Sequence, residues 1–397
     1  MEFDPFSSDF FDDPYETYRW LRDHAPVYRN ERYGFWALSR YDDVVAAHRD
    51  WETFSSSHGV TIDQLIDERR TTVDESIIFL DPPEHERLRR LVSRVFTPKA
   101  MADLEPLVRT LVRGHADAIG DATSFDLVAD LAAPFPVEVI STILGVPEPD
   151  RQQIRHWADE MLRREPDNPQ PTQAGMEAGL HMIAYLLDLT AEKRAHPTDD
   201  MLSQLILADV PDDDGGTYRL TDGEVASFGT LLAAAGSETV TKLIGSGAVL
   251  FAQHPDQWEK VLADPDALGG AIEEILRYWA PSQYQGRFTH SAVTLHGVTI
   301  PADSPVLLIT GAANHDERAY ADPDRFDIDR PLQLSLGFGH GIHSCLGAAL
   351  ARLESRVAFE EIRQRWPRYT IDEAGLRRVQ MANVAGFCNV PARSGPS

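Results

Sequence analysis

The sequence around Cys345 favours a reactive thiolate at this position. It belongs to the segment Phe338-Gly339-His340-Gly341-Ile342-His343-Ser344-Cys345-Leu346-Gly347, and an amphipathic helix is expected over 346–366. A cysteine in the first turn of a helix has a lowered pKa, because the helix dipole and the free amides favour the thiolate. The glycines of the segment let the backbone approach a large flat ligand. Taken alone, a buried free cysteine in a glycine-rich turn is the alternative.

A second segment with side chains that could take part in a reaction lies inside a long predicted helix. Thr221 and Glu224 form a capping box and Pro255 marks the end, which predicts a helix from about Asp222 to Gln253. Such a helix spans on the order of 45 Å and crosses the whole molecule, which favours one large domain. Its middle reads Ala235-Gly236-Ser237-Glu238-Thr239. The Thr239 hydroxyl can bond a preceding carbonyl and open the helix locally. Alternatively, the small residues only allow tight packing and Glu238 is a cap or a surface charge.

Other charged residues are spaced so that they share a helix face. Glu274 and Arg277 are three apart and can pair, although most such pairs are exposed and contribute under about 1 kcal/mol. His85 and Arg89 follow Asp81-Pro82-Pro83 one turn apart, so together they could hold a carboxylate. For each basic residue the alternative is a solvated surface charge.

These segments occur in the order found in one known family. The cysteine segment matches, at every defining position, the haem-binding signature Phe-Gly-x-Gly-x-His-x-Cys-x-Gly of the cytochrome P450 superfamily. Over roughly residues 15–391 the chain resembles the soluble bacterial branch of that superfamily. The resemblance implies a single haem-thiolate monooxygenase domain over 1–397, mainly α with a small β region. It places haem between the long central helix and the cysteine-loop helix.

The resemblance also assigns residues to the cofactor. Cys345 would be the axial ligand of the iron of haem b, and such a thiolate pushes electron density toward the iron. His343 would bond a haem propionate, Phe338 would pack near the sulfur, and Gly339 would also belong to the cofactor-binding residues. The other propionate partners would be His85, Arg89 and Arg287.

By the same resemblance, Glu238 and Thr239 are the catalytic pair. Thr239 would steady bound dioxygen, while Glu238 connects a proton path. The matching segment Glu274-Ile275-Leu276-Arg277 would support the cysteine loop through a buried Glu-Arg-Arg network. Arg330 would complete that network, with Arg325 as an alternative.

The expected reaction is hydroxylation or epoxidation of a hydrophobic small molecule with O2 and two electrons. The sequence has no nucleotide-binding glycine fingerprint and no iron–sulfur cysteine set, so a separate ferredoxin and ferredoxin reductase are expected. Arg352, Arg356 and Arg94 are predicted to form a basic patch for the ferredoxin; a helix face with ordinary ion pairs is the alternative. A peroxide-driven peroxygenase and a non-enzymatic haem ligand-binding protein are the rival functions.

The substrate pocket is expected to include Ala235, Gln283, Tyr284 and Phe387. The family commonly has apolar residues after Pro281, whereas this chain reads Ser282-Gln283-Tyr284-Gln285. This departure predicts a polar anchor for the substrate; alternatively, the amides satisfy local backbone groups. A steroid, a terpenoid, a polyketide or a lipid each fits the expectation.

The elements that position these residues are mostly helical. β-rich portions are predicted near 25–60 and 290–310, with hairpins over 28–38 and 293–300, and residues 392–397 are expected to be a frayed tail. The net charge of −26 argues against nucleic acid and anionic membranes as partners. We expect a soluble cytoplasmic protein for three reasons. The chain has only two cysteines, it lacks a signal peptide, and it has no stretch near 20 apolar residues.

Overall fold

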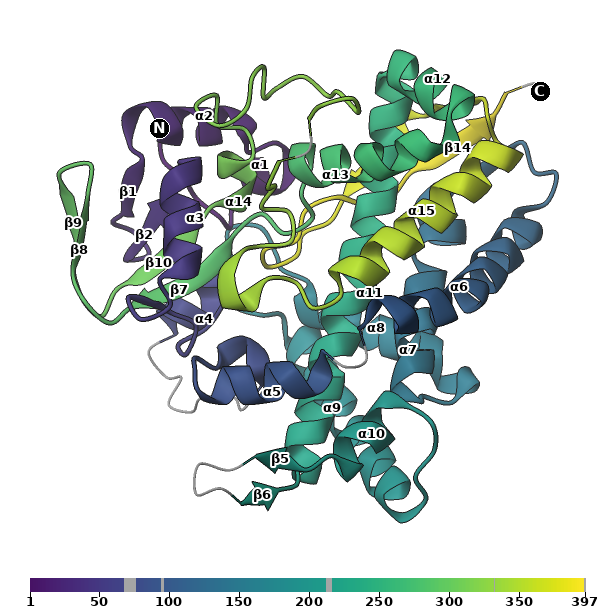
Figure 1. Ribbon diagram of the computed structural model, residues 1–397. Helices are drawn as coiled ribbons and strands as arrows, with labels where there is room; N and C mark the ends of the chain where they lie inside the picture. Colours follow the sequence, from purple (N-terminus) through teal and green to yellow (C-terminus); the bar gives the residue numbers. More distant parts are fainter. Residues whose placement is uncertain (68–75, 94–95, 212–215, 332, 396–397) are drawn as a thin grey trace.

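The structure, a computed structural model, describes residues 1–67, 76–93, 96–211, 216–331 and 333–395. Most of the described chain is helical (Figure 1). Its α-helices are α1 (Ser8–Asp12), α2 (Tyr15–His24), α3 (Tyr41–Arg49), α4 (Ile62–Ile66), α5 (Glu84–Val92), α6 (Pro98–Ile119), α7 (Pro134–Leu144), α8 (Arg151–Leu162), α9 (Gln173–Ala195), α10 (Met201–Leu207), α11 (Asp222–Gln253), α12 (Pro255–Ala263), α13 (Leu268–Tyr278), α14 (Thr310–Ala313) and α15 (Ala348–Arg365).

The strands are short and form several small sheets. They are β1 (Val27–Asn30), β2 (Phe35–Leu38), β3 (Phe54–Ser55), β4 (Ser124–Asp126), β5 (Val210–Pro211), β6 (Thr217–Tyr218), β7 (Gln285–Thr289), β8 (Val293–Leu295), β9 (Val298–Ile300), β10 (Pro305–Leu308), β11 (Tyr369–Ile371), β12 (Arg377–Arg378), β13 (Phe387–Asn389) and β14 (Pro391–Ser394). The mainly α class with a small β region is therefore the observed one.

Helix α11 runs through the centre of the molecule (Figure 1). Its start is fixed by the predicted capping box, in which the Thr221 side chain accepts from the Glu224 amide and the Glu224 carboxylate accepts from the Thr221 amide. From Val240 to Phe251 every residue is buried, because α7, α8, α9 and α15 pack around the helix. A helix surrounded in this way can present functional groups only where the packing leaves a gap.

The largest sheet has the strand order β1-β2-β10-β7-β3. β2 and β10 pair in parallel, whereas β7 is antiparallel to β10, with Arg287 opposite Val306. One side of this sheet packs against an aromatic cluster from the first 40 residues, which includes Phe3, Phe10, Tyr18 and Phe35. The sheet thereby fixes the position of β7, the strand that carries Arg287.

Two expectations from the sequence are corrected here. Residues 391–394 form β14, which pairs with both β4 and β11, so much of the expected frayed tail is part of a sheet. In addition, Leu127–Leu144 is apolar and long enough to cross a membrane by composition, although no stretch near that length was expected. Because 67% of this segment is buried inside the molecule, it has the properties of a core helix.

Candidate functional site: a cysteine loop facing the central helix

The cysteine loop, residues 338–347, contains a short 3-10 turn, Gly341–His343, and leads into α15. The amide of Cys345 donates to the Phe338 carbonyl at 2.8 Å, which closes the loop. Gly341 has φ +71°, and a Cβ there would lie 2.1 Å from the His48 carbonyl oxygen, so only glycine fits against α3. The loop is therefore held on a backbone that the glycine spacing makes possible.

The position and the pKa of Cys345 differ from the sequence expectation. The helix starts at Ala348 with Gly347 as its N-cap, so Cys345 precedes the helix and is not in its first turn. Surrounding protein raises the pKa of the Cys345 thiol, although the Gly347 amide, Arg89 and Arg352 act in the opposite direction. The side chain is nonetheless exposed. Cys345 is therefore available to a ligand although protein surrounds it on other sides. A metal ion bound there would supply the positive charge that favours the thiolate.

Basic side chains from separate elements gather beside this loop. The rings of His85 on α5 and His343 lie 4.4 Å apart, and the Arg89 guanidinium donates to the Ser344 carbonyl at 2.7 Å. Arg287 is 4% exposed, and the only hydrogen bond of its guanidinium among the described residues goes to the neighbouring carbonyl of Gly286. The structure thus brings together four of the predicted propionate partners from α5, β7 and the cysteine loop.

Several ring nitrogens of this cluster lack hydrogen-bond partners among the described residues. Both ring nitrogens of His85 and Nε2 of His343 are buried without a hydrogen bond. Burial, together with the neighbouring Arg89, lowers the pKa of His85 to about 4, and burial lowers the pKa of Arg287 to about 10. Burying unpaired cations and imidazoles is costly, so these groups fit an anionic ligand. A haem with two propionates beside Cys345 fits this set of donors.

Helix α11 presents one accessible stretch to solvent in its middle. Ala235 is exposed, whereas Ala233 and Ser237 on either side are buried. The Thr239 hydroxyl donates to the Ala235 carbonyl at 2.9 Å, and the helix continues unbroken. An exposed alanine halfway along a central helix marks a space beside the helix, and small side chains there leave room for a bound group.

Glu238, on the same helix, is buried. Its side chain is 3% exposed, and its Oε2 atom lies 2.6 Å from Lys242 Nζ, one turn further along α11. Burial alone would raise the pKa of Glu238, but Lys242 and a hydrogen bond from Asp159 outweigh burial, so the pKa is lowered. The carboxylate is therefore neither a helix cap nor a surface charge.

A buried ion network lies beneath the loop. Arg277 donates to both carboxylate oxygens of Glu274 at 2.8 Å, and Arg330 Nε lies 3.1 Å from Glu274 Oε2. Arg330 also donates to the carbonyls of Ala321, Asp322 and Arg325. Arg325 itself is 63% exposed and pairs with Asp327. The geometry thus places Arg330, not Arg325, at the third position of this network.

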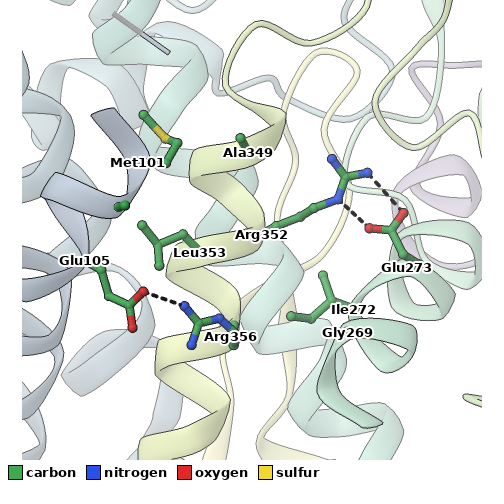
Figure 2. A pocket seen from close by; sticks show the side chains of 10 residues that line it. Met101, Glu105, Gly269, Ile272, Glu273, Ala349, Arg352, Leu353 and Arg356 are labelled. Carbon is green, nitrogen blue, oxygen red and sulfur yellow. Dashed lines mark hydrogen bonds and ion pairs between the residues drawn. The ribbon is translucent and has the colours of Figure 1, made fainter. Parts of the chain in front are cut away.

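The predicted basic patch differs from the structure. Arg352 pairs with Glu273, and Arg356 pairs with Glu105 (Figure 2). Arg356 also pairs with Glu360, so each guanidinium group has an acidic partner. Arg94 lies outside the described residues. The two arginines flank a cavity of about 290 Å³ between α6, α13 and α15, whose lining includes Met101, Ile272 and Leu353. Arg352 also stacks on Phe338, with 4.6 Å from its guanidinium carbon to the ring centre.

Three of the predicted pocket residues lie in packed surroundings. Gln283 donates to the Ala280 carbonyl at 2.7 Å and accepts from the Tyr18 hydroxyl at 3.0 Å, so both ends of its amide are engaged locally, which corrects the predicted polar anchor. Tyr284 is fully buried in the amino-terminal aromatic cluster. Phe387 is 3% exposed and packs against Trp279 and Arg378. Ala235 is the pocket candidate that the structure leaves accessible.

Some residues of the site were not found by sequence reasoning. Lys242 follows Glu238 by four positions, so the i,i+4 spacing could have indicated the pair. Asp159 comes from α8, and only the tertiary packing of α8 on α11 brings it to Glu238. His48 on α3 carries two further buried ring nitrogens without partners, and nothing in its local sequence distinguishes it.

Comparison with known proteins decides the family. The sequence model of the family "Cytochrome P450" matches residues 26–374. The chain belongs to the cytochrome P450 family. It is 40% identical to the putative cytochrome P450 123 of Mycobacterium tuberculosis, an alignment that covers 98% of this chain and 96% of the relative. It is also 40% identical to the erythromycin C-12 hydroxylase of Saccharopolyspora erythraea, over 95% of this chain and 93% of that protein.

A solved structure shares the whole architecture. A mutant of the P450 EryK in complex with erythromycin B superposes with a TM-score of 0.87 at 38% identity, covering 96% of both chains. This P450 is accordingly a haem-iron monooxygenase that uses O2, a hydrophobic substrate and redox partners. The fold and the ordered motifs agree on that reaction class.

Proposed function

We propose that this P450 hydroxylates a hydrophobic small molecule through a haem b held by Cys345, as a single domain over residues 1–397. The observation that carries the assignment is the cluster of Arg89, Arg287, His85 and His343 beside the accessible Cys345 sulfur. His85 and Arg287 are buried, and none of the four groups forms an ion pair with an acidic side chain among the described residues. Two propionates would provide anionic partners for these groups, and Cys345 would hold the iron.

When bound, the haem iron supplies dioxygen activation, and the chain supplies position and protons. Cys345 would ligate the iron, while the cation–π contact between Arg352 and Phe338 would hold the phenylalanine beside the sulfur. The buried network of Glu274, Arg277 and Arg330 would keep the loop at a fixed distance from α11. The role of that network is positional.

On the opposite side, the small residues around Ala235 would leave space for substrate and dioxygen. The Thr239 hydroxyl, which donates to the Ala235 carbonyl, would position dioxygen and water in this space, and the Glu238 carboxylate would relay protons toward it. Excluding bulk water from this space limits loss of electrons to side reactions.

The electron donor that we propose is a ferredoxin reduced by its own reductase, in the cytoplasm. The sequence carries no flavin or nicotinamide fingerprint of its own, which supports a separate donor. The curated relatives include hydroxylases of erythromycin, 6-deoxyerythronolide B and vitamin D3. We accordingly propose a substrate of comparable size and apolar character, with its polar groups contacted by residues other than Gln283.

The test is turnover with 18O2, a ferredoxin, its reductase and NADPH. Candidate macrolides, steroids and fatty acids are first screened by the change in haem spin state on binding. The proposal expects one 18O atom in the product and dependence on the ferredoxin system. Equal turnover with hydrogen peroxide alone would support the peroxygenase instead. Ligand binding without product from any electron source would support a haem protein without catalysis.

A further inference from the structure

The ring of His48 on α3 carries a further inference, because it is a buried imidazole without a partner among the described residues. His48 is 3% exposed, and both of its ring nitrogens are buried without a hydrogen bond. A neutral imidazole has one N–H donor and one acceptor nitrogen. Burying such groups unpaired is costly, so an orphaned imidazole at this depth indicates a missing partner.

The fold places this ring against the cysteine loop. Helix α3 packs on the 3-10 turn at 341–343, and a Cβ at Gly341 would lie 2.1 Å from the His48 carbonyl oxygen. The ring itself lies next to Gly339, because a Cβ there would lie 4.0 Å from His48 Cε1. The loop therefore lets α3 bring an imidazole to the edge of the site assigned to the cofactor.

The neighbours of the His48 ring are cationic or neutral. Arg287 on β7 and the rings of His340 and His343 are its ionisable neighbours, and no carboxylate of the described residues acts on it. The Gln285 amide, also beside the ring, is held by two other side chains. Burial and then Arg287 lower the pKa of His48 to about 3, so the ring is neutral at pH 7 and offers one N–H. An anion here would accept that N–H and compensate Arg287 at the same time.

We propose that His48 is a further cofactor-binding residue of this P450, which donates a ring N–H to the haem propionate that Arg287 also binds. The inference rests on the haem site proposed above. It adds a contact from α3, whereas the other propionate candidates lie on α5, β7 and the cysteine loop. The bond gives His48 the acceptor that it lacks and ties the cofactor to the helix that packs on the loop. An ordered water molecule bonded to the ring is the alternative.

Haem transfer from the ferric holoenzyme to apomyoglobin tests the contact without using turnover. His48→Leu should release haem about tenfold faster, which is the effect of one hydrogen bond to a charged group. The propionate bending band in the resonance Raman spectrum should also shift. His48→Asn or His48→Gln, which keep an N–H donor, should restore part of both. The matched control is His315→Leu, which removes a buried imidazole bonded at both nitrogens and should leave the band unchanged.

Double variants test whether the two residues share one propionate. The effects of His48→Leu and Arg287→Leu on the release rate should be less than additive, whereas those of His48→Leu and Arg89→Leu should add. Additivity with Arg287→Leu would contradict the shared propionate.

The apoprotein separates this role from a purely structural one. Without haem, His48→Leu should leave the urea midpoint unchanged or raise it, because two unpaired polar atoms are removed from the interior. Unchanged haem release and an unchanged propionate band in His48→Leu would overturn the role of His48 in favour of the water molecule. The proposed function would stand in that case, provided that the wild type shows the red-shifted carbon monoxide band. A wild type that takes up no haem would overturn both.

Discussion

Lys242 Nζ lies 2.6 Å from Glu238 Oε2, one turn apart on the central helix, and both side chains are almost completely buried. Burying a charge is tolerated when a partner of opposite charge is this close. The pair therefore keeps a carboxylate next to Thr239 without exposing it to bulk water. It links the stability of α11 to the proton supply of the site.

Replacing Lys242 with Met should destabilise the protein at neutral pH by about 3 kcal/mol, because Glu238 loses its counter-ion. The pKa of Glu238 is lowered in the folded state, so the stability from this pair is present above the unfolded pKa and is lost as pH falls. The difference from wild type should thus stay constant from pH 7 to about pH 5 and shrink as the pH falls below about 4. Urea unfolding at several pH values measures it. Lys260→Met, which removes exposed pairs, should cost under about 1 kcal/mol, and an equal loss would contradict the account.

Arg330 and Arg325 form a matched comparison within one loop. Arg330→Leu should cost about 3–5 kcal/mol and reduce haem content, because Glu274 and three carbonyls lose a buried donor. Arg325→Leu should change stability by under about 0.5 kcal/mol, since this side chain is largely exposed. Thermal unfolding and the ratio of haem to protein absorbance give both values. Equal effects of the two variants would refute the assignment of Arg330.

Arg287 should show opposite effects on the protein with and without cofactor. Without haem, Arg287→Leu should leave stability unchanged or raise it, because a buried cation without an anionic partner among the described residues is removed. With haem, the variant should release the cofactor about tenfold to a hundredfold faster. Haem transfer to apomyoglobin measures the release. An unchanged release rate would mean that Arg287 does not contact the cofactor.

Gln283→Leu should affect folding more than substrate. The variant leaves the Tyr18 hydroxyl and the Ala280 carbonyl buried without their partner, which costs about 1–3 kcal/mol. A double-mutant cycle with Tyr18→Phe should recover part of the loss, because both partners are then apolar. Substrate affinity, read from the spin-state titration, should change less than threefold. A tenfold weaker affinity with normal stability would restore the idea of a polar anchor.

Local signals in the sequence were sufficient for several parts of the structure. The capping box and Pro255 gave both ends of α11, and the glycine spacing gave the shape of the cysteine loop. The predicted helix begins at residue 346, whereas α15 begins at Ala348. The apolar pattern runs through Gly347 without a break, so the sequence does not mark this residue as the N-cap.

The remaining features depend on contacts between distant parts of the chain. Arg352 pairs with an acidic residue on α13, and Arg356 pairs with one on α6. The sequence does not show that these helices lie beside α15, so it predicts an unpaired basic patch. Asp159 is one of several carboxylates on α8 until the packing on α11 distinguishes it. The strand at 391–394 likewise needs β4 and β11 beside it.

The measurement that tests the central claim most directly is the absorption spectrum of the reduced protein after addition of carbon monoxide. Wild type and Cys388→Ser should show the strongly red-shifted Soret band of a thiolate-ligated haem, since Cys388 lies on β13 outside the cysteine loop. Cys345→Ser should bind haem without that shift. A red-shifted band in Cys345→Ser, or none in the wild type, would contradict thiolate ligation by Cys345.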